Sequence, residues 1–384
     1  MIGVSYGFAR YGYGLFEPEI REAFGLSVGA SGVIASGAYV GYVIALSAAG
    51  LLASRIGPRP LVTAAGVSAA VGMALVITAD QPWELLAGLA VAGASSGFAW
   101  APYSDAIAQL VTPARRHALL AAIPSGTAFG IAVAGGLALS GMGTAWRRAW
   151  IIFCVVAVVA TVYNIWLLRG TKPTSRSEGQ AQPGSLRSLL RPGTRTLYST
   201  ALSYGVVGAV YWTFSVSAIS QAAPANTVVG ALFWTLIGIA GISAVGSGWV
   251  FAKLGLRRSH SLLLGGLAAA TVLLAIAPWS WPAIGVSAIV YGVGFMATSG
   301  LLAVWSYRVF PDQPSVGFSA TVLFLGIGAI VGPALFGALA DAWNLRAALM
   351  ASAAIAVAAL SQRPPITTVH EPFASDGSSR RKSV

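Results

Sequence analysis

Charged residues and cysteines are both scarce in this chain. Only 9% of its 384 residues are charged, and the single cysteine, Cys154, excludes a disulfide within the chain. The three histidines are far apart in the sequence and there is no Gly-x-x-x-x-Gly-Lys-Ser/Thr motif, so neither a metal site nor ATP binding is indicated. No serine, histidine and acid form a hydrolytic set. We therefore expect a protein that is not an enzyme, with no catalytic residues, no cofactor and no metal.

Apolar residues take the place of the missing charge. They make up 56% of the sequence, and the mean hydropathy is +0.76. A soluble protein of this length cannot bury so much apolar surface in one core, whereas lipid can cover it. The net charge of +12 raises nucleic acid as a partner. The basic residues lie mainly in one set of loops, however, which favours membrane lipid as the partner and argues against nucleic acid.

Apolar segments of membrane-spanning length follow one another along the whole chain. A transmembrane helix needs about 20 mostly apolar residues. The first segment lacks a basic leader and an obvious cleavage site, and we interpret it as a retained helix. We predict an all-α membrane protein with twelve spans, at 1–17, 28–52, 60–79, 84–110, 117–140, 148–169, 196–219, 227–252, 260–278, 282–307, 316–339 and 345–361.

The sequence also repeats itself once. The segment 50–59 recurs at 248–257, an offset of 198 residues, and Tyr6 and Tyr13 have mates at Tyr204 and Tyr211 at the same offset. Two related six-helix halves in one chain are typical of secondary transporters. We predict four regions: an N-terminal six-helix bundle, a cytoplasmic linker rich in Gly, Ser and Pro, a C-terminal six-helix bundle and a disordered cytoplasmic tail, at 1–169, 170–195, 196–361 and 362–384.

The loop charges predict the orientation. Of the 23 Lys and Arg residues, 18 fall in the linker, the tail and the loops on the same side, and only four fall in loops on the other side. Positive loops stay in the cytoplasm. We expect a multi-pass protein of the plasma (inner) membrane with both termini cytoplasmic.

The repeated segment resembles the signature loop between helices two and three of the major facilitator superfamily, which runs roughly G-x-L-A-D-R-x-G-R-R. Ser54 replaces the usual Asp, and the second copy matches less well. The resemblance implies two pseudo-symmetric six-helix bundles that act by alternating access on a small-molecule substrate, for which a monomer suffices. It also implies a cytoplasmic gating loop at Gly50, Arg55, Gly57, Arg59, Lys253, Gly255 and Arg257.

A glycine series supports the same resemblance. Gly126, Gly130 and Gly135 of the fifth span return as Gly328, Gly332 and Gly337 of the eleventh. Such spacing lets helix backbones approach closely where two halves rock, although ordinary helix packing explains it equally well.

Arg10 is the most informative single residue. At 1.5 Å per residue it lies about 13 Å into the first span, where a charge usually faces a cavity or a partner. Its repeat mate is Gly208, so only one half carries the charge. On an α-helix Tyr6, Arg10, Tyr13 and Glu17 share one stripe.

The resemblance implies that helices one, four, seven and ten line the central cavity. We predict that Arg10 binds an anionic group while aromatic side chains enclose an apolar body. The alternative is that Arg10 pairs permanently with Glu17, Asp105 or helix carbonyls and that the aromatics only pack. The predicted substrate-binding residues are Tyr6, Arg10, Tyr13, Trp100, Tyr103, Tyr204, Tyr211, Tyr291 and Thr298.

Glu17 and Asp105 are the carboxylates within spans, which makes them the candidates for proton coupling and protons the candidate coupling ion. The favoured cargo is a small organic anion or amphipathic metabolite. The alternatives are an efflux pump for apolar or cationic compounds, in which aromatic walls and Glu17 would bind the cargo, and a non-transporting receptor or sensor on the same fold.

Overall fold

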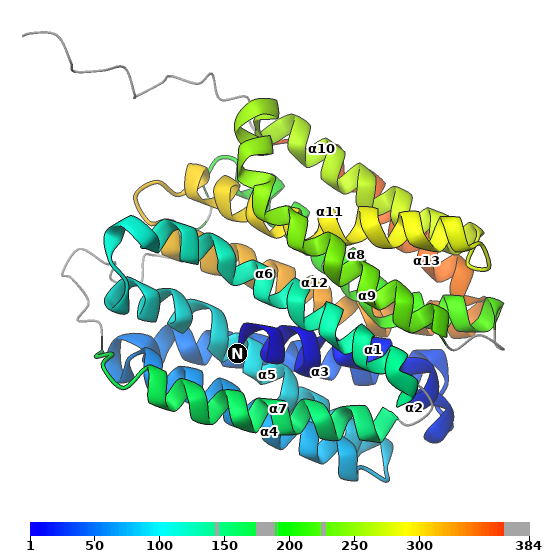
Figure 1. The fold of residues 1–384 in the computed structure, drawn as a ribbon. Coiled ribbons are helices and arrows are strands. Elements are labelled where there is room, and N and C mark those ends of the chain that lie inside the picture. Colours follow the sequence, from blue (N-terminus) through cyan, green and yellow to red (C-terminus); the bar gives the residue numbers. More distant parts are fainter. Residues whose placement is uncertain (143–145, 174–188, 190, 224–227, 365–384) are drawn as a thin grey trace, which may run out of the picture.

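The computed structural model describes residues 1–142, 146–173, 189, 191–223 and 228–364, and within these ranges the chain is helical with no strand. The first half of the chain forms the lower, blue-to-green bundle in Figure 1. Its elements are the π-helix η1 (Gly3–Arg10), the α-helices α1 (Gly12–Leu15), α2 (Glu17–Ala23), α3 (Val28–Ile56), α4 (Pro58–Thr78), α5 (Pro82–Leu110) and α6 (Pro113–Leu137), the short π-helix η2 (Ala138–Met142), and α7 (Trp146–Leu167).

The second half forms the upper, green-to-orange bundle of Figure 1. Its elements are α8 (Thr194–Ala222), α9 (Val228–Ile242), the 3-10 turn η4 (Ser243–Gly246), α10 (Ser247–Ile276), α11 (Trp281–Val309), α12 (Pro314–Ala342) and α13 (Leu345–Ala359). We refer to η1–α7 as the N-terminal half and to α8–α13 as the C-terminal half.

Each of the twelve predicted spans coincides with helix. Eight helical stretches among the described residues are long and apolar enough to cross a membrane, and one of them, Val228–Ile276, holds two predicted spans in sequence. The predicted spans 117–140 and 345–361 contain the shorter apolar helices Ser125–Ser140 and Leu345–Ala359. The first span differs from the prediction, because it is broken into η1, α1 and α2 instead of one α-helix.

The repeat is visible in the backbone as well as in the sequence. Gly57, between α3 and α4, has φ 78° and ψ 179°, and its repeat mate Gly255 has φ 73° and ψ 159° within α10. Positive φ is accessible to glycine and strained for other residues. The shared turn joins two helical segments in each half. In α10 it separates a short first part, which holds the end of the predicted eighth span, from a longer second part, which holds most of the predicted ninth span.

The two halves meet along a few helix pairs. α3 packs against α12, α6 packs against α9, and the short helices α1 and α2 pack against α8. At Gly14 of α1, an added Cβ would overlap the carbonyl oxygen of Trp212 in α8, so the two backbones touch directly. The halves are thus in close contact around the broken first span.

The predicted glycine series make close backbone contacts of two kinds. Gly130 of α6 lies against the backbone of Gly3 and Gly7 in η1, and Gly328 of α12 lies against Leu202 in α8. Gly135 and Gly337 instead contact α9 and α3 of the opposite half. Both series therefore pack within their own half and also across the interface.

Most of the predicted linker and tail lies outside the described residues, at 174–188, 190 and 365–384. The boundaries of the linker and the tail remain predictions.

Candidate functional site

Arg10 lies at the centre of a cage of four tyrosine rings, which we call the tyrosine cage. Its guanidinium carbon is 3.9 Å from the ring centre of Tyr42, 5.0 Å from Tyr39, 5.3 Å from Tyr11 and 5.5 Å from Tyr6. Distances below about 6 Å allow cation–π attraction. The side chain is only 6% exposed, so the rings replace much of the lost hydration.

The local backbone brings this cage together. In η1 the Tyr11 N–H donates to the Tyr6 carbonyl at 3.0 Å, an i to i+5 bond that widens the helix. Single π-turns of this kind occur often at functional sites. Tyr39 and Tyr42 are three positions apart on α3 and therefore share a face, which here lies toward η1.

Arg10 has no carboxylate partner among the described residues. Glu17 pairs instead with Arg21, whose Nε lies 3.2 Å from Glu17 Oε1, and no ion pair joins Arg10 to Asp105 in the described part of the chain. Within the described ranges the buried Arg10 Nε has no hydrogen-bond partner. A buried cation with an unused donor costs free energy unless a further acceptor arrives. The permanent pairing of Arg10 with Glu17 or Asp105 is therefore not present in this structure.

A small cavity opens beside the Arg10 side chain at the interface of the two halves. Its volume holds about one water molecule, so in this conformation the space is too small for an organic solute. The lining combines a cation, phenols and an indole from both halves: Arg10, Tyr11, Tyr13, Gly14, Ala35, Ala38, Tyr39, Trp212 and Thr213.

Trp212 of α8 connects the tyrosine cage to a wall of aromatic rings. Tyr11 stacks on Trp212 with ring centres 4.7 Å apart, and Trp212 meets Phe295 at 5.3 Å and Tyr291 at 5.4 Å, both edge to face. Trp234 of α9 lies 5.1 Å away on another side. The Trp212 Nε1 is buried without a hydrogen-bond partner. The site therefore places a cation and a flat apolar wall next to each other.

The predicted aromatic residues divide between this site and local packing. Tyr6 touches both Arg10 and Trp100, whose ring centre lies 5.8 Å from that of Tyr6. Tyr211 stacks on Tyr291 with ring centres 3.5 Å apart, and its hydroxyl bonds Ser287 at 2.6 Å. The contacts of these residues support a shared aromatic site across η1, α5, α8 and α11.

Three predicted residues have hydroxyl groups that are used elsewhere. The Tyr103 hydroxyl donates to Asn164 of α7 within the N-terminal half. The Thr298 hydroxyl donates to the Gly294 carbonyl of its own helix at 2.6 Å, and the Tyr204 hydroxyl donates to the Phe295 carbonyl at 2.7 Å. In this conformation these hydroxyls form hydrogen bonds within their own half of the protein. The centre of the Tyr204 ring lies 5.0 Å from that of Phe295 in the aromatic wall.

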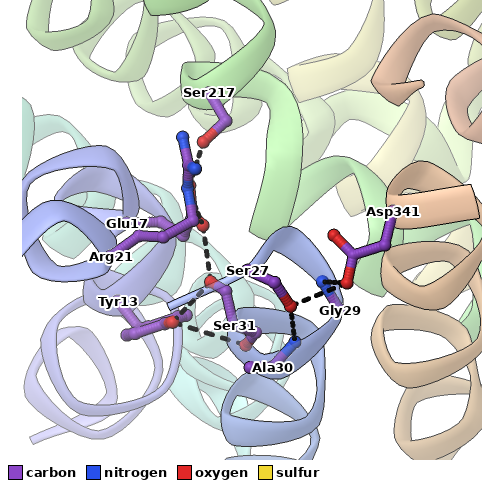
Figure 2. A network of polar contacts seen from close by, with 9 residues as sticks. All are labelled: Tyr13, Glu17, Arg21, Ser27, Gly29, Ala30, Ser31, Ser217 and Asp341. Atoms are coloured by element: carbon purple, nitrogen blue, oxygen red, sulfur yellow. Dashed lines mark hydrogen bonds and ion pairs between the residues drawn. The ribbon is translucent and has the colours of Figure 1, made fainter. Parts of the chain in front are cut away.

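Glu17 occupies a second polar site at the other end of Tyr13. It is fully buried at the start of α2, and it accepts hydrogen bonds from Ser31 of α3 at 2.5 Å and from Ser217 of α8 (Figure 2). The Tyr13 hydroxyl lies 2.7 Å from the Ser31 Oγ. The broken helix thus separates the predicted stripe into an Arg10 site and a Glu17 site.

The other candidate carboxylate has fewer contacts. Asp105 is half-buried near the end of α5, and no hydrogen bond or ion pair of its side chain occurs among the described residues. Of the two candidates, only Glu17 connects the halves.

The predicted gating loop lies at the basic end of the bundle. Arg59 Nε donates to the Ile165 carbonyl of α7 at 3.2 Å, and Lys253 Nζ lies 3.8 Å from the ring centre of Trp249. Arg55 is exposed at the end of α3, Arg257 is half-buried, and Gly50 has open space around it. The loop residues form local contacts in this state.

Sequence reasoning missed several residues of both sites. Tyr39 and Tyr42 are uncharged aromatics in a span that was not expected to line the cavity, and their spacing of three on one helix face was the available signal. Nothing in a single sequence brings Ser217 to Glu17, because the two are 200 residues apart. Also missed were Tyr11, Ser31, Trp212 and Thr213.

Known proteins share this architecture. The nucleoside transporter NupG has a TM-score of 0.75 at 11% identity, covering 94% of this chain and 96% of that chain. A bacterial homologue of the human lysosomal transporter Spinster, inward-facing and unoccupied, has a TM-score of 0.72 at 14% identity, covering 94% of each chain. The fucose:proton symporter FucP of E. coli has a TM-score of 0.61 at 17% identity, covering 94% of this chain and 95% of that chain.

Sequence comparison agrees with the fold. The gentisate transporter of Corynebacterium glutamicum is 25% identical in an alignment 350 residues long, which covers 87% of this chain and 78% of that protein. The family model described as Major Facilitator Superfamily matches residues 1–324. The chain therefore belongs to the Major Facilitator Superfamily and is a multi-pass membrane transporter of small solutes.

Proposed function

We propose that the protein carries a small organic anion across the membrane by alternating access, and that an aromatic carboxylate is its best-fitting cargo. The observation that supports this most is the Arg10 side chain, which is buried between the halves without a carboxylate partner among the described residues. A guanidinium binds carboxylate oxygens with strong, paired hydrogen bonds.

The aromatic wall supports a flat body next to that carboxylate. Trp212, Phe295 and Tyr11 surround the space next to Arg10 with ring faces and edges. The similarity to a gentisate transporter points the same way, because gentisate is an aromatic carboxylate. Of the predicted residues, Tyr6, Arg10 and Tyr13 would contact cargo directly, and Trp100, Tyr211 and Tyr291 would support the walls.

Binding to the detergent-purified protein tests this proposal. Benzoate, gentisate, benzamide and benzyltrimethylammonium are compared by thermal shift, since a ligand that binds the native state raises the melting temperature. We expect the two carboxylates to stabilise the protein and the neutral amide and the cation to have no effect. Stabilisation by the cation alone would favour the alternative function, an efflux pump in which the aromatic walls and Glu17 bind apolar or cationic compounds.

Flux through the membrane separates a transporter from a receptor on the same fold. We expect saturable uptake of labelled gentisate into proteoliposomes, and binding without flux would contradict the transport cycle proposed here. A monomer contains both halves of the site, so we propose that transport needs no second copy.

We further propose that protons drive this transport and that Glu17 is the coupling carboxylate. Glu17 is buried at the contact between the halves, whereas Asp105 is half-buried and lies within one half. Uptake should increase when a pH gradient is imposed, and Glu17→Gln should remove that increase while Asp105→Asn retains it. Uptake by the native protein that ignores the gradient would indicate facilitated diffusion.

A further inference from the structure

Two carboxylates connect the halves reciprocally at the end of the bundle opposite the basic loops (Figure 2). Glu17 of the N-terminal half accepts a hydrogen bond from Ser217 of α8. Asp341 of α12 accepts one from the Ser27 hydroxyl at 2.7 Å and one from the Gly29 N–H at 2.9 Å, both at the start of α3. Each half thus supplies one carboxylate and one serine.

We propose that these two contacts are latches that close the substrate cavity at this end, and that the transport cycle must break both. We call them the Glu17 latch (Glu17, Ser31 and Ser217) and the Asp341 latch (Asp341, Ser27 and Gly29). This inference goes beyond the proposed function, because it concerns access to the cavity and holds for any cargo.

The chemistry of the contacts suits closures that form and break repeatedly. Hydrogen bonds to a carboxylate are stronger than those between neutral groups. The Asp341 carboxylate also meets the start of α3, where backbone N–H groups lack helical partners and the helix dipole favours an anion. Asp341 is nevertheless exposed, so water can replace its partners when the halves separate.

The Glu17 latch is connected to the cavity from both sides. Ser31 donates its one hydroxyl proton to Glu17, so the Tyr13 hydroxyl is the donor in the bond to Ser31 Oγ. Tyr13 lines the cavity, and so does Thr213, which lies one helical turn before Ser217 on α8. A cargo that moves either wall of the cavity therefore moves one side of this latch.

Packing between α3 and α12 agrees with closure at this end. Ser36 Oγ donates to the Ile330 carbonyl at 2.7 Å, and a Cβ at Gly32 would overlap the Pro333 carbonyl. The α3 glycines that pack tightly against α12, Gly29 and Gly32, thus lie in the part of the helix next to the latches.

Cysteine labelling tests the proposal, because the chain has only one native cysteine to remove. Thr213→Cys is placed in a Cys154→Ser background, and a membrane-impermeant maleimide is added on the side from which Asp80→Cys, an exposed position at the latch end, is labelled. We expect slow labelling of Thr213→Cys with intact latches and labelling several-fold faster after Ser217→Ala combined with Asp341→Asn.

Two matched variants separate unlatching from general loosening. Ser215→Ala changes a buried serine two positions away on α8 whose hydroxyl has no hydrogen-bond partner in the described part of the chain, and Asp312→Asn removes a carboxylate that pairs with Arg191. We expect neither change to alter the labelling rate. Equal acceleration by these controls, or no acceleration by the latch variants, would overturn the proposal.

A cross-link provides the reverse test and does not depend on the stability of the latch variants. Ser27→Cys and Asp341→Cys are joined by a short reducible cross-linker in the Cys154→Ser background. Uptake should stop on cross-linking and return after reduction. Full uptake by the cross-linked protein would show that the halves need not separate here and would refute the Asp341 latch.

Discussion

Arg10 is kept charged inside the protein by aromatic rings and not by an acid. Each ring within reach contributes about 0.5–2 kcal/mol of cation–π attraction, and four rings surround this guanidinium. Unlike an aspartate or glutamate, a ring does not neutralise the positive charge. The charge would therefore remain available to an incoming anion, as the proposed function requires.

Variants of Arg10 test this role through ligand affinity. A hydrogen bond to a charged group is worth about 1.5–3 kcal/mol, so Arg10→Gln should weaken carboxylate binding roughly 10- to 100-fold. Arg10→Lys retains the charge but loses the planar, forked guanidinium. Its affinity for a carboxylate should lie between those of the native protein and Arg10→Gln. Titration calorimetry with gentisate measures both. Unchanged affinity in a folded Arg10→Gln protein would assign Arg10 to structure alone.

Glu19 carries a second prediction at the residue scale. It lies in α2, beyond the predicted first span, and burial, with a smaller contribution from the nearby Glu17 charge, raises the pKa of its carboxyl to about 7. The folded state then binds the proton more tightly than the unfolded state. The stability that depends on this proton is present below pH 4.5 and is lost as pH rises towards 7.

This direction of the pH dependence gives a prediction for Glu19→Gln. The melting temperature of the native protein should decrease between pH 5 and about 8. That of Glu19→Gln should decrease less over the same range, because its side chain has no proton to release. Asp80→Asn, which changes an exposed carboxylate in another loop, serves as the control. Parallel pH profiles for the native protein and Glu19→Gln would contradict the raised pKa.

Some residues could be found from the sequence and others could not. Arg10 was predictable, because a charge within an apolar span is costly and rare. Tyr39 and Tyr42 resemble any aromatic pair in a membrane helix, and only the fold shows that their rings reach Arg10. The hydrogen-bond partner of Glu17 could not be predicted either, because Ser217 belongs to the other half.

Among the elements, the turns at Gly57 and Gly255 are the clearest product of the repeat. Their shared sequence pattern was visible at an offset of 198 residues, and both glycines adopt positive φ. The break in the first span was not visible, because it depends on tertiary contacts. Gly14 fits against the Trp212 carbonyl, and Gly7 fits against Gly130, only when α8 and α6 are in place.

The two turns give a prediction with an internal comparison. An alanine at either glycine is strained by about 1–3 kcal/mol, because backbone with positive φ and ψ near 180° is populated almost only by glycine. At Gly57 the new Cβ would also lie 2.9 Å from the Pro173 nitrogen, whereas at Gly255 the space is open. Gly57→Ala should therefore lower the melting temperature more than Gly255→Ala does.

Thermal unfolding in detergent measures this difference. Gly50→Ala is the matched control, because Gly50 lies in helical backbone with open space, where alanine is the better helix former. It should leave the melting temperature unchanged or raise it. Equal losses at Gly57 and Gly255 would show that backbone strain alone matters at the two turns and that the contact with Pro173 does not.

At the scale of the whole molecule, the arrangement of two halves followed from the repeat, but their mutual contacts did not. Periodicity and segment length are local properties, so they predict helices and their order. The contacts of α3 with α12 and of α6 with α9 join segments far apart in the sequence; Ser36 and Ile330, for example, are 294 positions apart. These contacts are also hard to predict because a transporter adopts at least two arrangements with the same sequence.

Orientation is the last property that the sequence predicts for the whole molecule, and it can be measured directly. The 18-to-4 distribution of basic loop residues predicts that the linker side faces the cytoplasm. Lys172 and Asp80 are exposed residues at opposite ends of the bundle. In a Cys154→Ser background, an impermeant maleimide added to intact cells should label Asp80→Cys at once and Lys172→Cys only after permeabilisation. The opposite pattern would invert the orientation and place the latch end in the cytoplasm, with the carboxylate latches then closing the inner side of the cavity.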